Sequence, residues 1–146
     1  MVPSVAGTFQ RRGLTVLRTF VRRSGDRPLE RTFGSRRGLA RIFAGAAERF
    51  DPDGADGFSG ALQFDLRRSS GAVSHWVIVV AHDRATARPG TAEGPALTAQ
   101  LSVADAIRIL TGDLDAGTAI LEGRLDLLGD FGVAMGLGRM FGAGPV

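Results

Sequence analysis

The 146-residue chain contains no cysteine and no tyrosine, and its eighteen basic residues include no lysine. Without cysteine it can form no disulfide, no thiolate metal site and no thiol nucleophile. Its uninterrupted apolar runs, such as Val77–Ala81, are far shorter than the ~20 residues that a membrane-spanning helix requires. With 44% hydrophobic and 23% charged residues, the composition is that of an ordinary globular domain. We therefore expect one soluble folded unit.

Charge is divided unevenly along the chain. Residues 1–50 carry 11 arginines and three acidic residues, a net charge of +8, whereas residues 51–146 carry seven arginines and 12 acidic residues, a net charge of −5. Such asymmetry indicates a basic surface for an anionic partner. Exclusive use of arginine, with no asparagine and abundant glycine and alanine, is also typical of a high-GC coding bias, which explains part of the basic charge.

The basic half begins with an amphipathic pattern over residues 8–23, where apolar residues recur at helical spacing and arginines line the opposite face. We expect residues 1–34 to form a basic helical extension and residues 35–146 to form the main domain. The extension is a candidate for docking on an anionic membrane surface. The apolar face holds Leu14, Leu17, Phe20 and Val21, and the opposite face holds Arg11, Arg18 and Arg22.

Periodicity predicts an α+β fold with a five-stranded, mainly antiparallel sheet and helices packed on one side. Residues 61–67 alternate apolar and polar side chains, and residues 74–82 are rich in β-branched residues, as is typical of strands. Residues 24–28 and 51–57 carry turn residues and are expected to break the chain. The full expectation is helices at 8–23, 35–50, 103–111, 116–122 and 131–141, and strands at 61–67, 74–82, 84–88, 96–101 and 124–130.

Several polar residues are explained by local structure. Ser102 and Asp105 have the S-x-x-D spacing of a capping box at the start of helix 103–111. Asp115 is expected to cap the following helix. A solvated strand face of alternating charge accounts for Arg124, Asp126 and Asp130.

Residues suited to catalysis or metal binding do not form a recognisable motif. His75 and His82 are seven residues apart on one expected strand, so they would point to opposite faces and could not share a metal ion. The sequence has no nucleophile elbow, Walker loop or HExxH motif. We therefore predict no catalytic residues, no metal and no cofactor, which favours a binding protein over an enzyme.

The C-terminal helix 131–141 combines three glycines with bulky apolar residues. A glycine destabilises a helix interior by ~1 kcal/mol relative to alanine, so this is a poor sequence for a purely structural helix. Its methionines can repack around varied ligands. We interpret the helix as a mobile apolar flap, with plain core packing as the alternative.

The segment Pro95–Phe141 resembles the second half of the sterol carrier protein 2 family of lipid-transfer domains. The match lies in a strand ending LTAQLS, a capped helix VADAIRILTG, the run DLDAGTAILEGRLDLLGD and a closing apolar helix. Upstream, GFSGALQFDL and HWVIVV look like the first two strands of that family, so the resemblance covers residues 36–141. The basic segment 1–34 resembles extensions on bacterial members, and together with the composition it predicts a bacterial, actinobacterial source.

The resemblance implies helices and sheet that enclose an apolar tunnel for fatty acyl chains, acyl-CoA, sterols or isoprenoids. We expect non-catalytic binding or transfer of such a molecule, in the cytoplasm because no targeting signal is visible. Oligomeric state stays open. The candidate lining residues are Trp76, Ile107, Leu110, Ile120, Leu121, Phe131, Met135 and Met140.

Two other functions are weighed against this one. In an enzyme or biosynthetic accessory acting on a polyketide-like intermediate, a polar group facing into the same cavity would serve as acid or base; the candidates are His82, Asp65 and Arg88. Nucleic-acid binding through the basic half is disfavoured, because the arginines there form no known recognition motif.

Overall fold

The structure, a computed structural model, describes residues 25–141; the helix predicted at 8–23, with Arg11, Arg18 and Arg22, lies outside them. The helices are α2 (Asp26–Phe33), α3 (Arg36–Glu48), α4 (Pro52–Ala55), α5 (Val103–Leu110), α6 (Ala116–Leu121) and α7 (Phe131–Phe141). The strands are β1 (Gly60–Arg67), β2 (Val73–Ala81), β3 (Arg84–Pro89), β4 (Leu97–Ser102) and β5 (Leu125–Gly129). Among residues 25–141, no helix is both long and apolar enough to cross a membrane.

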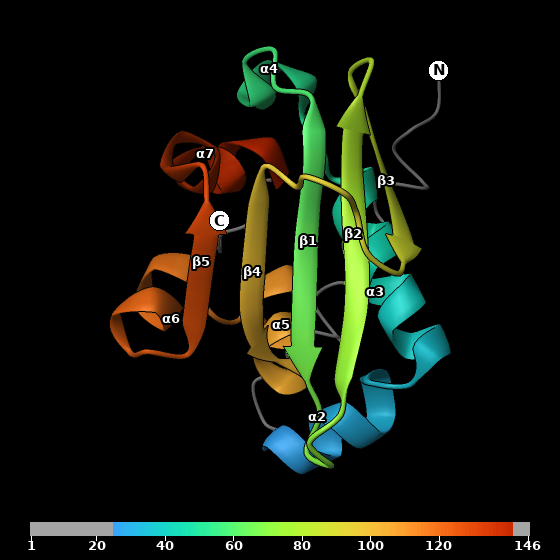
Figure 1. The fold of residues 1–146 in the computed structure, drawn as a ribbon. Coiled ribbons are helices and arrows are strands. Elements are labelled where there is room, and N and C mark those ends of the chain that lie inside the picture. Colours follow the sequence, from blue (N-terminus) through green and yellow to red (C-terminus); the bar gives the residue numbers. More distant parts are fainter. Residues whose placement is uncertain (1–24, 142–146) are drawn as a thin grey trace, which may run out of the picture.

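The five strands form one sheet in the order β3-β2-β1-β4-β5. All neighbours are antiparallel except β1 and β4, which run parallel. This parallel pair arises because the connection between β3 and β4 passes across β2 and β1 before the chain re-enters the sheet, as Figure 1 shows. The prediction of an α+β fold with a mainly antiparallel five-stranded sheet is therefore confirmed.

The core lies between the sheet and the helices behind it, α2, α3 and α5 (Figure 1). Alternation along β1 points Leu62, Phe64 and Leu66 to this side. The ring of Phe43 on α3 stacks on Trp76 of β2 with centroids 5.1 Å apart, and it meets Phe64 edge-on at the same centroid distance. An aromatic side chain buried in this way stabilises the fold by about 1.5–3 kcal/mol, so α3 is fixed to the middle of the sheet.

The opposite face of the sheet is crossed by the β3–β4 connection, and the buried Gln63 of β1 holds that connection in place. Its Nε2 donates to the carbonyl oxygen of Gly90 (3.3 Å), and its Oε1 accepts from the amide nitrogen of Ala92 (2.9 Å). A buried amide requires such partners, because an unsatisfied polar group costs about 1–3 kcal/mol.

Helix α2 begins where the sequence predicted a chain break. Pro28 lies in its first turn, where a proline is tolerated because the missing N–H has no partner within the helix. Leu29 is fully buried, and the carboxylate of Glu30 accepts hydrogen bonds from the backbone and hydroxyl of Ser69 in the β1–β2 turn. The last part of the predicted extension thus packs on the core, while the division at residue 34 stays a prediction.

A second short helix, α4, replaces part of the acidic loop predicted at 51–57. Asp51 caps it by accepting from the amide nitrogen of Asp53 (3.0 Å), and Pro52 occupies the first turn. Asp56, with a φ of +51°, ends it in the left-handed conformation. The same Asp and Pro residues that indicate a loop also favour a single helical turn.

Candidate apolar binding site

Four of the eight residues predicted to line a tunnel lie in or against the core. Trp76, Ile107 and Met140 are buried members of one hydrophobic cluster, and the half-buried Leu110 packs against it. They come from β2, α5 and α7, so the structure brings together elements that are distant in sequence. Trp76 already has Phe43 stacked on it.

The other four lie on the outside of the two C-terminal helices. On α6, Ile120 is 44% and Leu121 89% exposed; on α7, Phe131 is 76% and Met135 68% exposed. The structure therefore does not gather all eight residues around one interior space. The two helices lie at opposite ends of β5 (Figure 1), so the exposed residues form two separate surfaces.

Helix α7 divides its apolar residues between two faces. Gly136 and Met140, four positions apart, are buried. Phe131 and Met135, also four positions apart, occupy the exposed face and are neighbours on the helix surface. Because nearly every residue of this helix other than glycine is apolar, packing against one side leaves a second apolar stripe uncovered.

The C-terminal end of α7 is closely packed on α4. A Cβ atom at Gly54 would collide with the carbonyl oxygen of Arg139, and the amide nitrogen of Asp51 donates to the carbonyl oxygen of Met140 (2.6 Å). At the other end, the exposed Asp130 caps the helix by accepting from the amide nitrogen of Val133 (3.2 Å). The core-packing alternative thus holds for the second half of α7, and the mobile flap stays a prediction for its first turn.

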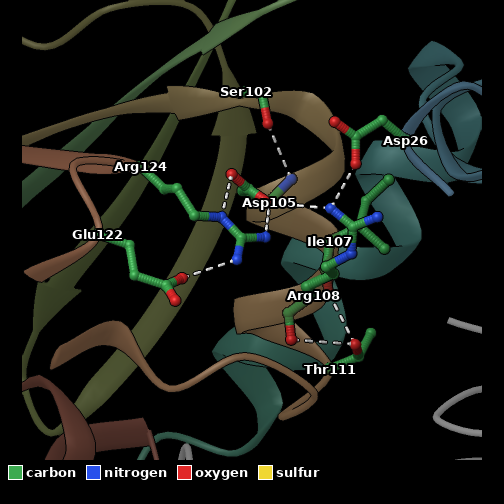
Figure 2. A network of polar contacts seen from close by, with 8 residues as sticks. All are labelled: Asp26, Ser102, Asp105, Ile107, Arg108, Thr111, Glu122 and Arg124. Atoms are coloured by element: carbon green, nitrogen blue, oxygen red, sulfur yellow. Dashed lines mark hydrogen bonds and ion pairs between the residues drawn. The ribbon is translucent and has the colours of Figure 1, made fainter. Parts of the chain in front are cut away.

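The start of α5 carries an ionic network that is buried at its centre, shown in Figure 2. The hydroxyl of Ser102 accepts from the amide nitrogen of Asp105 (3.0 Å), which confirms the predicted N-cap. The carboxylate of Asp105 does not complete the capping box. It accepts from Nε and Nη2 of Arg124 (3.1 and 2.6 Å) and from Nη1 of Arg108 (2.9 Å) instead. Asp105, which the sequence predicts to cap the helix, thus lies at the centre of an ionic network that joins α5 to a residue 19 positions away.

The network sets the ionisation of Asp105 and Arg124. Burial alone would raise the pKa of Asp105, but hydrogen bonds from Arg124 and Arg108 outweigh it and hold this pKa below its ordinary value. The hydrogen bond to Asp105 raises the pKa of Arg124 in turn. The interpretation of Arg124 as part of a solvated strand face is therefore wrong, because the residue lies just before β5 and is turned toward α5.

Two further ion pairs extend the network in both directions. Arg108 pairs with Asp26 at the start of α2 (2.6 Å), and Arg124 pairs with Glu122 at the end of α6 (2.9 Å). As Figure 2 shows, the five charged residues lie in a row from α2 to the beginning of β5. The sequence gives no signal for this row, since Asp105 and Arg124 are 19 positions apart.

The polar groups proposed for an enzyme lie away from the helix-covered face. Strand β2 ends before His82, which sits in the β2–β3 turn with a φ of +54°, so its placement on the same strand as His75 is wrong. Asp65 lies on the opposite side of β1 from Phe64 and bonds Nδ1 of His75 (2.7 Å). Arg88 is exposed on β3. None of the three faces the helices, and residues 25–141 contain no cluster of acidic residues and histidines placed to hold a metal ion.

Five half-buried apolar residues around α5, β5 and α7 pack against the core and were not among the eight predicted lining residues. All but Leu114, which lies between α5 and α6, follow helical or strand periodicity, and that periodicity is the signal that could have identified them. These residues are Ile109, Leu114, Leu127, Val133 and Leu137.

A five-stranded mixed sheet covered by helices on one face, with apolar surface on its last two helices, defines a class of sterol-carrier-like α+β domains. Residues 41–142 match the SCP-2 sterol transfer family, and the chain belongs to this family. A search of curated protein sequences finds no match.

Solved structures show the same fold. Sterol carrier protein 2 like 2 from Aedes aegypti is 26% identical, with a TM-score of 0.56 over 77% of this chain and 96% of that one. The palmitated form of that mosquito protein is 25% identical, with a TM-score of 0.55 over 68% and 86%. The sec-alkylsulfatase Pisa1 from Pseudomonas sp. shares the fold at 24% identity and a TM-score of 0.54 over 65% of this chain, which spans 15% of the enzyme's length.

Proposed function

We propose that this chain binds a single apolar small molecule with a fatty acyl-like chain and transfers it without chemical change. One observation carries the proposal: Phe131 and Met135 are exposed side by side on one face of α7, and the half-buried Val133 and Leu137 of the same helix pack against the core. Exposed apolar surface concentrated in one segment marks a binding site rather than random surface composition. Family membership and the palmitated mosquito relative support the same ligand class.

The first turn of α7 would be the entrance. From the exposed Phe131, the half-buried Val133 and Leu137 lead along the helix to the buried Met140. Met140 belongs to the same cluster as Ile107 and Trp76, so a chain inserted beside α7 would meet apolar side chains throughout. The proposed lining therefore has Phe131 and Met135 at the mouth and Ile107 and Met140 at the inner end, whereas Ile120 and Leu121 lie on the separate surface of α6 and are not part of it.

The energetics suit a carrier. Burying an acyl chain gains ~0.8 kcal/mol per CH₂ group, and much of that gain offsets the loss of translational and conformational freedom on binding. We expect micromolar affinity, on the order of −8 kcal/mol, which permits release as well as uptake.

The test is to identify what the purified protein carries. Native mass spectrometry, followed by organic extraction, should detect an acyl or isoprenoid species at about one per chain. The emptied protein should bind a fluorescent palmitate analogue, and unlabelled palmitate should displace it. A protein that is isolated empty and also fails to bind the fluorescent palmitate would overturn the proposal.

A further inference from the structure

The exposed surface of α6 differs from the mouth proposed on α7. Ile120 and Leu121 lie at the C-terminal end of α6, and we call them the α6 patch. Among the large apolar residues of the described chain, Leu121 is the most exposed. Residues 113–124, which run from just before α6 to just after it, carry three acidic residues and one arginine, a net charge of −2. That arginine, Arg124, is already paired with Asp105 and Glu122. The patch is therefore apolar with an acidic surround.

The described chain begins at one end of the ionic network, and the other end of that network lies next to this patch in the sequence. Asp26, in the first turn of α2, is joined through Arg108, Asp105 and Arg124 to Glu122. Figure 2 shows this row of side chains, and Glu122 directly follows Leu121 in the sequence. The 24 residues that precede Gly25 are thus tethered on the side of the molecule that carries this network and the α6 patch.

The charge of residues 1–24 is opposite to that of the residues around the α6 patch. Residues 1–24 contain five arginines and no acidic residue, a net charge of +5. Within them, residues 8–23 have the amphipathic pattern whose apolar face includes Leu17. As a helix they would be about 24 Å long, enough to cover a patch of two side chains and reach the acidic residues around it.

We propose that residues 8–23 dock on the α6 patch of the same chain, with Leu17 and its apolar neighbours against Ile120 and Leu121. Burial of apolar surface and attraction between net charges of +5 and −2 favour the same pairing, and the tether raises the local concentration of the segment. The contact covers an apolar surface that the main domain leaves exposed. It requires no bound ligand, so it stands or falls separately from the proposed function.

The absence of cysteine makes the test direct. In the full chain, the pair Leu17→Cys and Leu121→Cys should form an intramolecular disulfide about ten-fold faster than a control pair, because docking raises the effective concentration. The control pairs Leu17→Cys with Val73→Cys. Val73 is also exposed and lies near the β1–β2 turn that α2 contacts, but its neighbours in the sequence are not acidic. Raising the salt concentration should slow the first reaction toward the control rate.

Equal rates in the two variants would overturn the proposal, provided that circular dichroism shows both to be folded. Disulfides formed only between chains would also overturn it and identify a second copy as the partner. Equal rates combined with retention of the full chain on phosphatidylglycerol vesicles would overturn it in favour of a membrane surface as the occupant.

Discussion

Helices α5 and α7 border the same core but are attached in different ways. The start of α5 is fixed by the carboxylate of Asp105, which is held by two arginines from different elements. The start of α7 is capped by the exposed Asp130, whose amide nitrogen donates to the carbonyl oxygen of Ala96 (2.8 Å), and it presents Phe131 and Met135 to solvent. Long-range polar contacts thus secure one helix as part of the framework. The other exposes apolar side chains outside the core, and these are the ones that the proposed function assigns to the ligand.

The largest expected effect comes from breaking the attachment of α5. Asp105→Ala leaves Arg108 and Arg124 without their shared partner, and Arg108 has a side chain only 12% exposed. We expect the free energy of unfolding to fall by about 3 kcal/mol, measured by urea denaturation. The control, Glu122→Gln, removes the exposed end of the network and should cost less than about 1 kcal/mol. Equal losses in the two variants would contradict the central role of Asp105.

The attachment of α7 is tested at its other end. Gly54→Ala places a Cβ against the carbonyl oxygen of Arg139, and separating α4 from α7 should cost about 1–3 kcal/mol. The matched control is Gly45→Ala in α3, where the nearest atom to a new Cβ is 3.8 Å away in the Arg49 side chain. That change should stabilise the protein by up to ~1 kcal/mol through helix propensity. Thermal unfolding of both variants decides the matter, and a Gly54→Ala protein as stable as the parent would show that α4 and α7 are not packed as described.

The free energy of unfolding should fall at acid pH, because two carboxylates have lowered pKa values in the folded protein. Burial alone would raise the pKa of Asp105, but its arginine partners hold this pKa below the ordinary value of 3.8. The hydrogen bond from the hydroxyl of Ser69 lowers the pKa of Glu30 below its ordinary value of 4.5. With folded pKa values below the unfolded ones, both groups contribute fully above about pH 5, and the contribution is lost as the pH falls through the folded values. Urea denaturation from pH 7 to pH 3 should show this loss. A variant with Asp105→Asn should show a flatter profile, and an unchanged slope would count against Asp105 as its source.

Regular secondary structure was accessible from the sequence because it depends on local pattern. Alternation in β1 and the hydroxyl of Ser102 at the start of α5 are examples, since each acts within a few residues. The predicted end of β2 was wrong by one residue, because β-branched residues run to Val80 and nothing in the sequence indicates that His82 adopts a left-handed turn conformation.

The attachments that distinguish α5 from α7 were not accessible in the same way. Asp105 has the correct spacing for a capping box, and only the fold brings Arg124 close enough to compete for its carboxylate. Similarly, helical spacing identifies the apolar residues of α7 but not which of its two apolar stripes the core covers. That choice is set by α4, where Gly54 permits close approach. Periodicity therefore identified apolar residues correctly without separating Met140 in the core from Met135 at the surface.

The smallest effect on stability should accompany a marked effect on binding. Met135→Ser changes an exposed side chain, so the free energy of unfolding should stay within about 0.5 kcal/mol of the parent. If Met135 lies at the mouth, losing its contact with the ligand removes about 1.5 kcal/mol, or roughly ten-fold in affinity for fluorescent palmitate. Val73→Ser, an exposed apolar change far along the chain from α7, should leave affinity unchanged. Equal affinities in the two variants would show that the ligand binds elsewhere and that the exposed residues of α7 do not contact it.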